Sequence, residues 1–198
     1  MPAPKTLLEL SGADLQPPRL RDAVLVMIDL QNEYLAGPVA LPDAANAIGY
    51  AEKLLARARA AGAAIIHVAH KGRPGGLFDR DAERGAIVSA LAPLGDEPVI
   101  EKGLPNAFAG TDLAAQLATI GRKDLVLAGF MTHMCISSTA RAGLDLGYRI
   151  TVDADSCATR DLPDGRGGTI AAKTVNDVAL VELSDRFAII ARGDDALV

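Results

Sequence analysis

The sequence predicts a single three-layer α/β domain, in which a doubly wound, mainly parallel sheet of six strands carries helices on both faces. Short apolar runs recur along the chain, and segments of helical character alternate with them. Such runs are typical of strands buried on both faces, and strict alternation of strand and helix implies right-handed crossovers between parallel strands. With 198 residues and 49% hydrophobic content, the chain is long enough for one substantial core.

The expected strands are short runs rich in aliphatic and β-branched residues. The clearest is AVLVMID, in which an uninterrupted apolar run leads to Asp29. The expected strands cover residues 23–29, 63–70, 97–102, 124–130, 148–155 and, with a weaker pattern, 186–193.

The expected helices have polar or glycine residues at their boundaries. Asp43 is expected to cap the helix that ends before Gly62, and Thr111 and Gly121 frame a shorter helix in the same way. The expected helices cover residues 43–62, 79–95, 111–121, 134–147 and 168–185.

Residues 1–22 are expected to form an N-terminal arm, and residues 23–198 the domain. Pro17, Pro18 and the charged residues that follow them separate the arm from the first strand. The arm is too short to form a core of its own, so its leucines need a surface on the same domain or on a neighbouring subunit. These leucines are Leu7, Leu8, Leu10, Leu15 and Leu20.

The overall composition argues against several classes of partner. Charged residues make up 23% of the chain and the net charge is −5, which argues against binding to nucleic acid. No apolar run approaches the roughly 20 residues that cross a bilayer, and no signal-peptide core follows the N-terminus. We therefore expect a cytoplasmic protein without membrane contact. Cys135 and Cys157 match neither a disulfide framework nor a zinc pattern, so both are expected to be free thiols.

Three residues with reactive side chains lie where expected strands end. Asp29 ends the first strand, Lys102 ends the third, and Cys135 follows the fourth at the start of a helix. Ligands of doubly wound sheets bind beyond the carboxyl ends of the strands, so these side chains are expected to converge. Each also has a structural interpretation: Asp29 can cap a turn, Lys102 can be a solvated strand end, and Cys135 can be a small buried hydrophobic residue.

Together, the three side chains are typical of nucleophilic catalysis. A helix N-terminus and a nearby lysine both lower the pKa of a thiol, so we expect a reactive Cys135. Asp29 is then the general base that takes the thiol proton and returns it to a leaving group. Backbone N–H groups of the turn in GFMTHMC are expected to stabilise the oxyanion of a tetrahedral intermediate.

Three stretches resemble the isochorismatase-like cysteine hydrolase superfamily, which includes nicotinamidases, N-carbamoylsarcosine amidase and isochorismatases. They are VMIDLQNEY, EKGLPNAFAGTDL and GFMTHMCISSTARAGLDLGYRITVDADSCATRDL, and the resemblance extends from about residue 23 to residue 190. It implies a catalytic triad of Asp29, Lys102 and Cys135.

The resemblance also implies several features of the fold and assembly. The peptide bond between Phe130 and Met131 is expected to be cis, and the oxyanion is expected to bind the N–H groups of Met131 and Cys135. The implied strand order is 3-2-1-4-5-6, and the implied assembly is a homodimer or homotetramer.

The sequence lacks the metal site of nicotinamidases, which have a D-x-H…H arrangement after the second strand. The corresponding stretch here is AHKGRPGGLFDRD, with only His67 and His70 nearby. His67 is expected to be a core residue, and His70 points to the opposite face of an extended strand. We therefore expect neither a metal nor another cofactor, and nicotinamide becomes a less favoured substrate.

Candidate substrate-binding residues flank the proposed triad. They are Gln31, Tyr34, Phe78, Phe108 and His133. For Gln31, capping of a turn is an alternative role. For the two phenylalanines, core packing is the alternative. Cys157 is expected to lie beneath the loop after the fifth strand.

These residues predict a metal-independent cysteine hydrolase that cleaves a C–N bond of amide type in a small molecule. Cys135 forms an acyl-enzyme, Asp29 moves protons, and Lys102 holds the charges in register. Two alternatives stay open. One is cleavage of an enol ether of the isochorismatase type, which needs no nucleophile; the other is a scaffold or binding protein that keeps the fold without catalysis.

Overall fold

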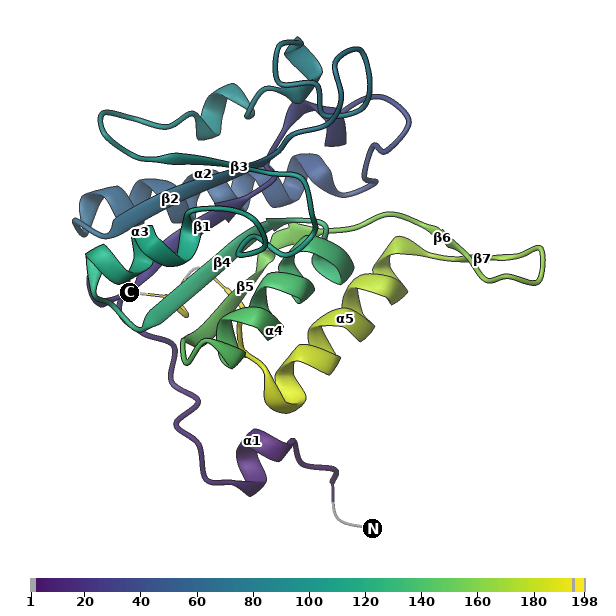
Figure 1. Cartoon of the computed structure of the whole chain (residues 1–198). Helices are drawn as coiled ribbons and strands as arrows, with labels where there is room; N and C mark the ends of the chain where they lie inside the picture. The colour runs from purple at the N-terminus through teal and green to yellow at the C-terminus, as the bar shows by residue number, and fades with distance from the viewer. Residues whose placement is uncertain (1–2, 194, 198) are drawn as a thin grey trace.

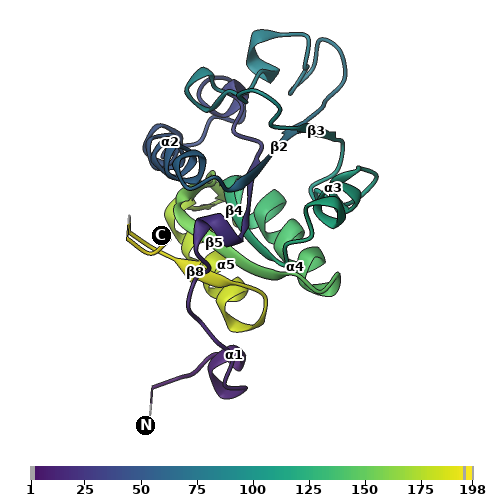
Figure 2. The same cartoon turned by 90° about the vertical axis from the view of Figure 1, so that its left-hand side faces the viewer.

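The computed structural model describes residues 3–193 and 195–197, which form a six-stranded sheet between two layers of helices (Figures 1 and 2). The strand order is β3-β2-β1-β4-β5-β8, and every neighbouring pair is parallel. This confirms the predicted order 3-2-1-4-5-6, with β8 as the sixth strand. The strands are β1 (Val24–Ile28), β2 (Ala64–His70), β3 (Val99–Lys102), β4 (Asp124–Phe130), β5 (Arg149–Ala158) and β8 (Ile189–Ala191).

Each face of the sheet has its own hydrophobic core. Leu25 and Met27 of β1 point towards α2 (Ala44–Ala60), whereas Val24 and Val26 point towards the other helical layer. That layer contains α3 (Leu113–Ile120), α4 (Ser137–Asp145) and α5 (Ala172–Arg186). Because successive side chains of a strand alternate between faces, a continuous apolar run satisfies both cores at once.

The helix boundaries agree in part with the expected caps. Gly62 and Gly121 adopt left-handed backbone conformations (φ 66° and 76°) at the ends of α2 and α3, where glycine has no steric penalty. Asp43 occupies the N-cap position of α2, but its side chain makes no capping hydrogen bond. The N-cap of α3 is Asp112 rather than Thr111, whose hydroxyl accepts a hydrogen bond from the Leu113 N–H group at 3.3 Å.

The helix expected at 79–95 is wrong. This segment contains only two 3₁₀ turns, at Glu83–Gly85 and Ser89–Leu91. Its backbone groups bond to the chain after β1 instead: Ile87 forms an antiparallel bridge with Gln31, and the Val88 N–H group donates to the Leu30 carbonyl at 2.9 Å. The segment therefore covers the end of β1.

A two-stranded hairpin of β6 (Leu162–Pro163) and β7 (Thr169–Ile170) projects from the domain between β5 and α5 (Figure 1). The expected helix at 168–185 consequently begins later, at Ala172. None of the helices in the described residues is both long enough and apolar enough to cross a membrane.

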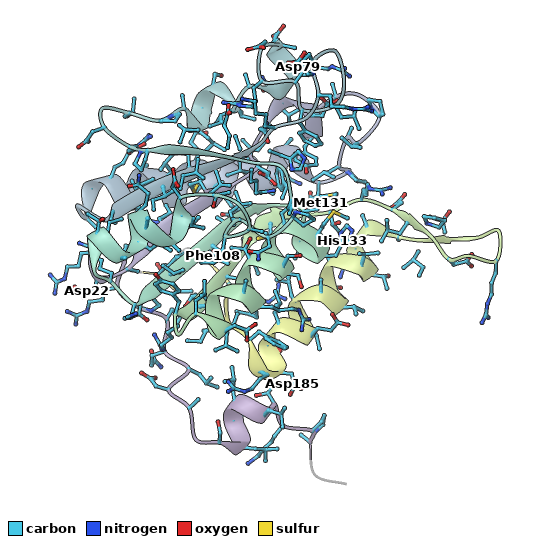
Figure 3. The ribbon with its side chains drawn as sticks, viewed as in Figure 1. Asp22, Asp79, Phe108, Met131, His133 and Asp185 are labelled. Carbon is cyan, nitrogen blue, oxygen red and sulfur yellow. The ribbon has the colours of Figure 1, made fainter. Side chains whose placement is uncertain are left out.

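The N-terminal arm packs against α5 of its own chain. Its short helix α1 (Leu7–Leu10) lies beside the end of α5, where the Leu7 N–H group donates to Asp185 Oδ1 at 2.8 Å (Figures 1 and 3). Leu20 is buried, but Leu7 and Leu10 stay 51% and 67% exposed. The domain thus covers only part of the apolar surface of the arm.

We expect the chain to assemble into at least a two-fold dimer, because α1 packs against α5 and both elements keep exposed apolar residues, among them Leu7 and Leu10 of α1 and Val178 and Val181 of α5. Light scattering should give a mass above the monomer value of 20.5 kDa. A concentration-independent monomer would contradict this prediction. Deletion of residues 1–20 serves as the control, because an unchanged oligomer would assign the interface to the domain body.

Candidate active site

Asp29, Lys102 and Cys135 meet at the carboxyl edge of the sheet. Lys102 Nζ lies 2.6 Å from Asp29 Oδ2 and 3.2 Å from Cys135 Sγ. The side chains of Asp29 and Lys102 are fully buried, and Cys135 is 4% exposed. The three residues come from different segments: Asp29 follows β1, Lys102 ends β3, and Cys135 lies in a π-helical turn, Thr132–Ile136, after β4.

The backbone around Asp29 turns sharply out of the sheet. Asp29 has a φ of 53°, a left-handed conformation that is uncommon for residues other than glycine. Its N–H group donates to the Val68 carbonyl of β2 at 2.8 Å, so the sheet fixes this turn. Uncommon backbone conformations of this kind concentrate at functional sites, where surrounding structure holds a side chain in place.

The turn that holds Cys135 depends on a glycine. Gly129 has a φ of 128°, and a Cβ atom there would lie 1.9 Å from the Ile28 carbonyl oxygen of β1. Next in the chain, the Phe130–Met131 peptide bond is cis, and the π-helical turn begins after Met131. Any larger residue at 129 would push β4 away from β1 and displace the turn.

The pKa of the Cys135 thiol is raised to about 12, which contradicts the expected lowering. Burial is the main cause, the negative charge of Asp29 adds to it, and the Lys102 ammonium only partly opposes it. Cys135 also lies within the π-helical turn, before the first residue of α4, and not at a free helix N-terminus. The thiol is therefore protonated at neutral pH.

Burial also raises the pKa of the Asp29 carboxyl, and the positive charge of Lys102 opposes this effect. A raised pKa makes Asp29 a stronger base than an ordinary aspartate, while the ammonium group beside it favours the ionised form. The pair is thus arranged to accept a proton from a neutral thiol.

Alkylation of Cys135 by iodoacetamide is expected to be slow at pH 7. Its rate should rise about tenfold per pH unit between pH 8 and pH 11, because the thiolate fraction grows in this way below a pKa of about 12. Mass spectrometry of the Cys135 peptide measures the rate, and glutathione serves as the reference thiol. Fast alkylation that is already constant at pH 7 would show that the thiol is ionised there.

His70 is a member of this cluster that the sequence patterns do not single out. Its Nδ1 atom lies 3.4 Å from Lys102 Nζ, whereas His67 lies on the other face and contacts Glu97 Oε2 at 3.0 Å. Alternation along β2 correctly predicts that the two histidines lie on opposite faces, and His70 lies on the face of Lys102. The strand order could have identified His70 as a member of the cluster, because β2 and β3 pair with His70 opposite Lys102.

Both polar atoms of the Gln31 side chain already have backbone partners. Its Nε2 atom donates to the carbonyls of His70 at 2.9 Å and Gly85 at 2.7 Å, and its Oε1 atom accepts from the His70 N–H group at 2.9 Å. Gln31 thus joins the end of β2 to the segment that covers β1. This role differs from the expected alternative, because the Gln31 side chain makes no capping hydrogen bond with the 3₁₀ turn Asn32–Tyr34 that it precedes.

Aromatic side chains form one wall beside the triad. The Phe78 ring lies 5.1 Å from the rings of both Tyr34 and His70, and Tyr34 also contacts Phe130 at 5.4 Å. Burial raises the pKa of the Tyr34 hydroxyl, and the negative charge of Asp29 raises it further. A cavity of about 570 Å³ opens next to His70 and Phe78.

Phe108 lies elsewhere. Its ring stacks on Tyr148 with 6.0 Å between centroids, and it packs beside Gly143 of α4 (Figure 3). The structure thus favours the alternative of core packing for Phe108. His133, by contrast, lies next to Met131 beside the end of β4, and its Nδ1 atom hydrogen-bonds with the Thr159 hydroxyl (Figure 3).

Glu33 is a second residue that no sequence pattern marks, because an acidic residue in a polar stretch normally faces solvent. Its side chain is fully buried; Oε2 accepts from the Phe78 N–H group at 3.0 Å, and Oε1 lies 3.2 Å from Arg84 Nη1. Glu33 thereby fixes the loop that presents Phe78 to the site. Within residues 3–193 and 195–197, no group of three or more His, Cys, Asp or Glu side chains is placed to share a metal ion.

Comparisons with known proteins agree with this arrangement. Residues 23–193 match the model of the isochorismatase domain family. The chain is 37% identical to a secreted isochorismatase effector of Verticillium dahliae, over 88% of this chain and 90% of that protein. It is 32% identical to maleamate amidohydrolase of Pseudomonas putida, over 67% of this chain and 70% of the relative.

A solved structure extends the similarity to nearly the whole chain. The crystal structure of an isochorismatase from Pseudomonas putida has a TM-score of 0.94 and 40% sequence identity, and covers 99% of this chain and 100% of its own. Together with the family match over the whole sheet, this similarity shows that the chain belongs to the isochorismatase family of hydrolases.

Proposed function

We propose that this protein is a cysteine hydrolase that cleaves a C–N bond of amide type in a small molecule. The observation that carries the proposal is the contact of one buried ammonium group, Lys102 Nζ, with both a carboxylate at 2.6 Å and a thiol at 3.2 Å. A thiol attacks acyl carbon atoms, and the carboxylate provides the proton transfers that such an attack requires. The similarity to maleamate amidohydrolase supports an amide as the substrate.

In the first half of the reaction, Asp29 takes the proton of the Cys135 thiol as sulfur attacks the carbonyl carbon. The new S–C bond converts the carbonyl oxygen into an oxyanion, which accepts hydrogen bonds from the N–H groups of Met131 and Cys135. The C–N bond then breaks, and Asp29 returns the proton to the leaving nitrogen. A thioester on Cys135 remains.

In the second half, Asp29 takes a proton from water, which attacks the thioester. The S–C bond breaks, the acid leaves, and the proton returns to the sulfur. Lys102 keeps the Asp29 carboxylate ionised at the start of each half, because a buried carboxylate without a cation would bind a proton. Because the thiol is neutral at rest, a base must lie beside it. The contact of Lys102 Nζ with both groups holds the Asp29 carboxylate next to the Cys135 thiol.

A second candidate is hydrolysis of an enol ether, which is favoured by the relatives that carry the name isochorismatase. That reaction needs no nucleophile, so it would tolerate the loss of the thiol. Cys135→Ala therefore separates the two candidates.

The test is a panel of small amides, ureas and lactams, assayed for release of ammonia or amine, with the Cys135→Ala protein as the blank. We expect at least one member to be hydrolysed by the wild-type protein and not by the variant. The proposal would be overturned in favour of the second candidate if the wild-type protein cleaved none of the C–N substrates and both proteins cleaved isochorismate.

A further inference from the structure

The imidazole ring of His70 completes the surroundings of the Lys102 ammonium group. Lys102 Nζ lies 2.6 Å from Asp29 Oδ2, 3.2 Å from Cys135 Sγ and 3.4 Å from His70 Nδ1. An ammonium group has three N–H donors and no acceptor, so each of these three atoms takes one donor. The proposed reaction uses the carboxylate and the thiol, but it assigns no role to the imidazole.

The contact with Lys102 determines the protonation state of the His70 ring. Because the ammonium group donates, His70 Nδ1 must accept, and a ring nitrogen accepts only when it carries no proton. The ring is therefore neutral, with its proton on Nε2. His70 also lines the cavity of about 570 Å³, through which protons from solvent reach the ring.

Neighbouring groups hold the ring in place from the side away from Lys102. Gln31, two residues after Asp29, accepts from the His70 N–H group and donates to the His70 carbonyl, both at 2.9 Å. The Phe78 ring packs edge-on against the imidazole, with 5.1 Å between centroids. His70 is thus a fixed acceptor for an ammonium group that is carried on a flexible four-carbon chain.

Two charged groups act on the ring and respond to its charge. Burial lowers the pKa of His70, the positive charge of Lys102 lowers it further, and the negative charge of Asp29 opposes both. Burial raises the pKa of Asp29, whereas Lys102 and a protonated His70 oppose that rise. A proton on His70 therefore removes the acceptor of the ammonium group, places a second cation 3.4 Å from it and makes Asp29 a weaker base.

The other titratable groups around the ring are neutral, paired or exposed. Arg73 lines the same cavity, but its side chain is exposed, so water and salt screen its charge. The remaining groups are the neutral Tyr34 and Cys135 and the ion pairs Glu33–Arg84, Lys71–Glu101 and Arg80–Glu101. His70 is therefore the group near Lys102 whose charge changes most easily in mildly acidic solution.

We propose that His70 is a positioning residue of the triad: its neutral ring holds the Lys102 ammonium group in the orientation that joins the Asp29 carboxylate to the Cys135 thiol. Protonation of the ring breaks this arrangement and stops the reaction. The inference rests on the proposed function for the reaction that His70 supports, but the contact between imidazole and ammonium group can be tested without any substrate.

The first test is the pH dependence of kcat/KM for an amide that the wild-type protein hydrolyses. Both His70 and Asp29 must be unprotonated in the free enzyme, so kcat/KM should fall about hundredfold per pH unit at the acid end. In His70→Asn, an amide oxygen takes the place of Nδ1 and does not titrate. This variant should stay active at neutral pH and lose only about tenfold per pH unit. Equal slopes in the two proteins would overturn the inference.

Two further variants separate the acceptor from the mere loss of a histidine. His70→Phe removes the acceptor, so its kcat at neutral pH should fall about tenfold or more. His67→Gln removes the other ring of β2, which contacts Glu97 on the opposite face at 3.0 Å, and should keep the hundredfold slope. Undiminished kcat in folded His70→Phe, or a tenfold slope in His67→Gln, would contradict the assignment to His70.

The second test is NMR of the histidine rings, which needs no hydrolysis. His70 of the wild-type protein should be the Nε2–H tautomer. Lys102→Met should raise the pKa of His70 because it removes the neighbouring charge, whereas Lys71→Met, which removes a charge paired with Glu101, should leave it unchanged. An Nδ1–H tautomer, or an unchanged pKa of His70 in folded Lys102→Met, would overturn the inference. Failure to hydrolyse any amide would instead overturn the proposed function, so the two failures are distinguishable.

Discussion

The Cys135→Ala protein is expected to lose amide hydrolysis by about 10⁴-fold or more in kcat, since removal of a nucleophile that acts together with its base abolishes the covalent route. The fold should persist, because the change removes one sulfur atom at the edge of the sheet. Steady-state release of ammonia or amine from the substrate found in the panel measures the effect, and near-ultraviolet circular dichroism verifies the fold.

Cys157→Ala is the matched control for this variant. Cys157 is as buried as Cys135, at 4% exposure each, and it lies opposite Gly129 in β5. Its removal is expected to cost about 1 kcal/mol of stability through lost packing, with kcat changed less than about threefold. Equal losses of activity in both variants would assign the effect to packing and not to a nucleophile.

Lys102→Met is expected to lower the free energy of unfolding by about 3–5 kcal/mol and to abolish activity. The substitution removes the cation 2.6 Å from Asp29 and leaves a fully buried carboxylate without compensation. Urea denaturation followed by circular dichroism measures the stability. The double variant Asp29→Asn/Lys102→Met removes both charges, so it should regain much of the stability while it stays inactive.

Lys71→Met is the control for the cost of a lost ion pair. Lys71 Nζ also lies 2.6 Å from a carboxylate, that of Glu101, but both side chains are well exposed, at 58% and 39%. Exposed pairs of this kind contribute about 0–1 kcal/mol, so the control should be nearly as stable as the wild type. If the Lys102→Met protein were as stable as the Lys71→Met control, Asp29 and Lys102 would not form the buried charged pair that the mechanism requires.

Much of the fold is predictable because local patterns agree with it. The central strands are short apolar runs that must satisfy two hydrophobic layers, as β1 does, and glycines such as Gly62 and Gly121 end helices where a left-handed residue is needed. The convergence of Asp29, Lys102 and Cys135 follows from the same rule, because carboxyl ends of parallel strands share one edge.

The errors arise where distant contacts decide the structure. The segment 79–95 has a helical pattern, but its backbone hydrogen bonds go to Leu30 and Gln31, which no local pattern indicates. The length of β5 was underestimated, since it continues to Ala158 through an irregularity opposite Leu127 and Gly129.

The chemistry of Cys135 was mispredicted for a related reason. Position before a helix and a nearby lysine predict a lowered thiol pKa, yet burial outweighs both, and burial depends on how the whole site packs. Slow alkylation at neutral pH is therefore compatible with an enzyme and not only with an inactive scaffold. It is the expected property of a thiol that gives up its proton only to Asp29 during the reaction.

The most direct test of the central proposal is a search for the acyl-enzyme. Wild-type protein is quenched with acid during turnover of an amide from the panel, and its peptides are analysed by mass spectrometry. We expect the mass of the acyl group on the peptide that contains Cys135. When the cysteine is carboxamidomethylated beforehand, we expect neither this acyl group nor product formation. An acyl group on another residue, or undiminished product formation by the protein with blocked Cys135, would contradict it.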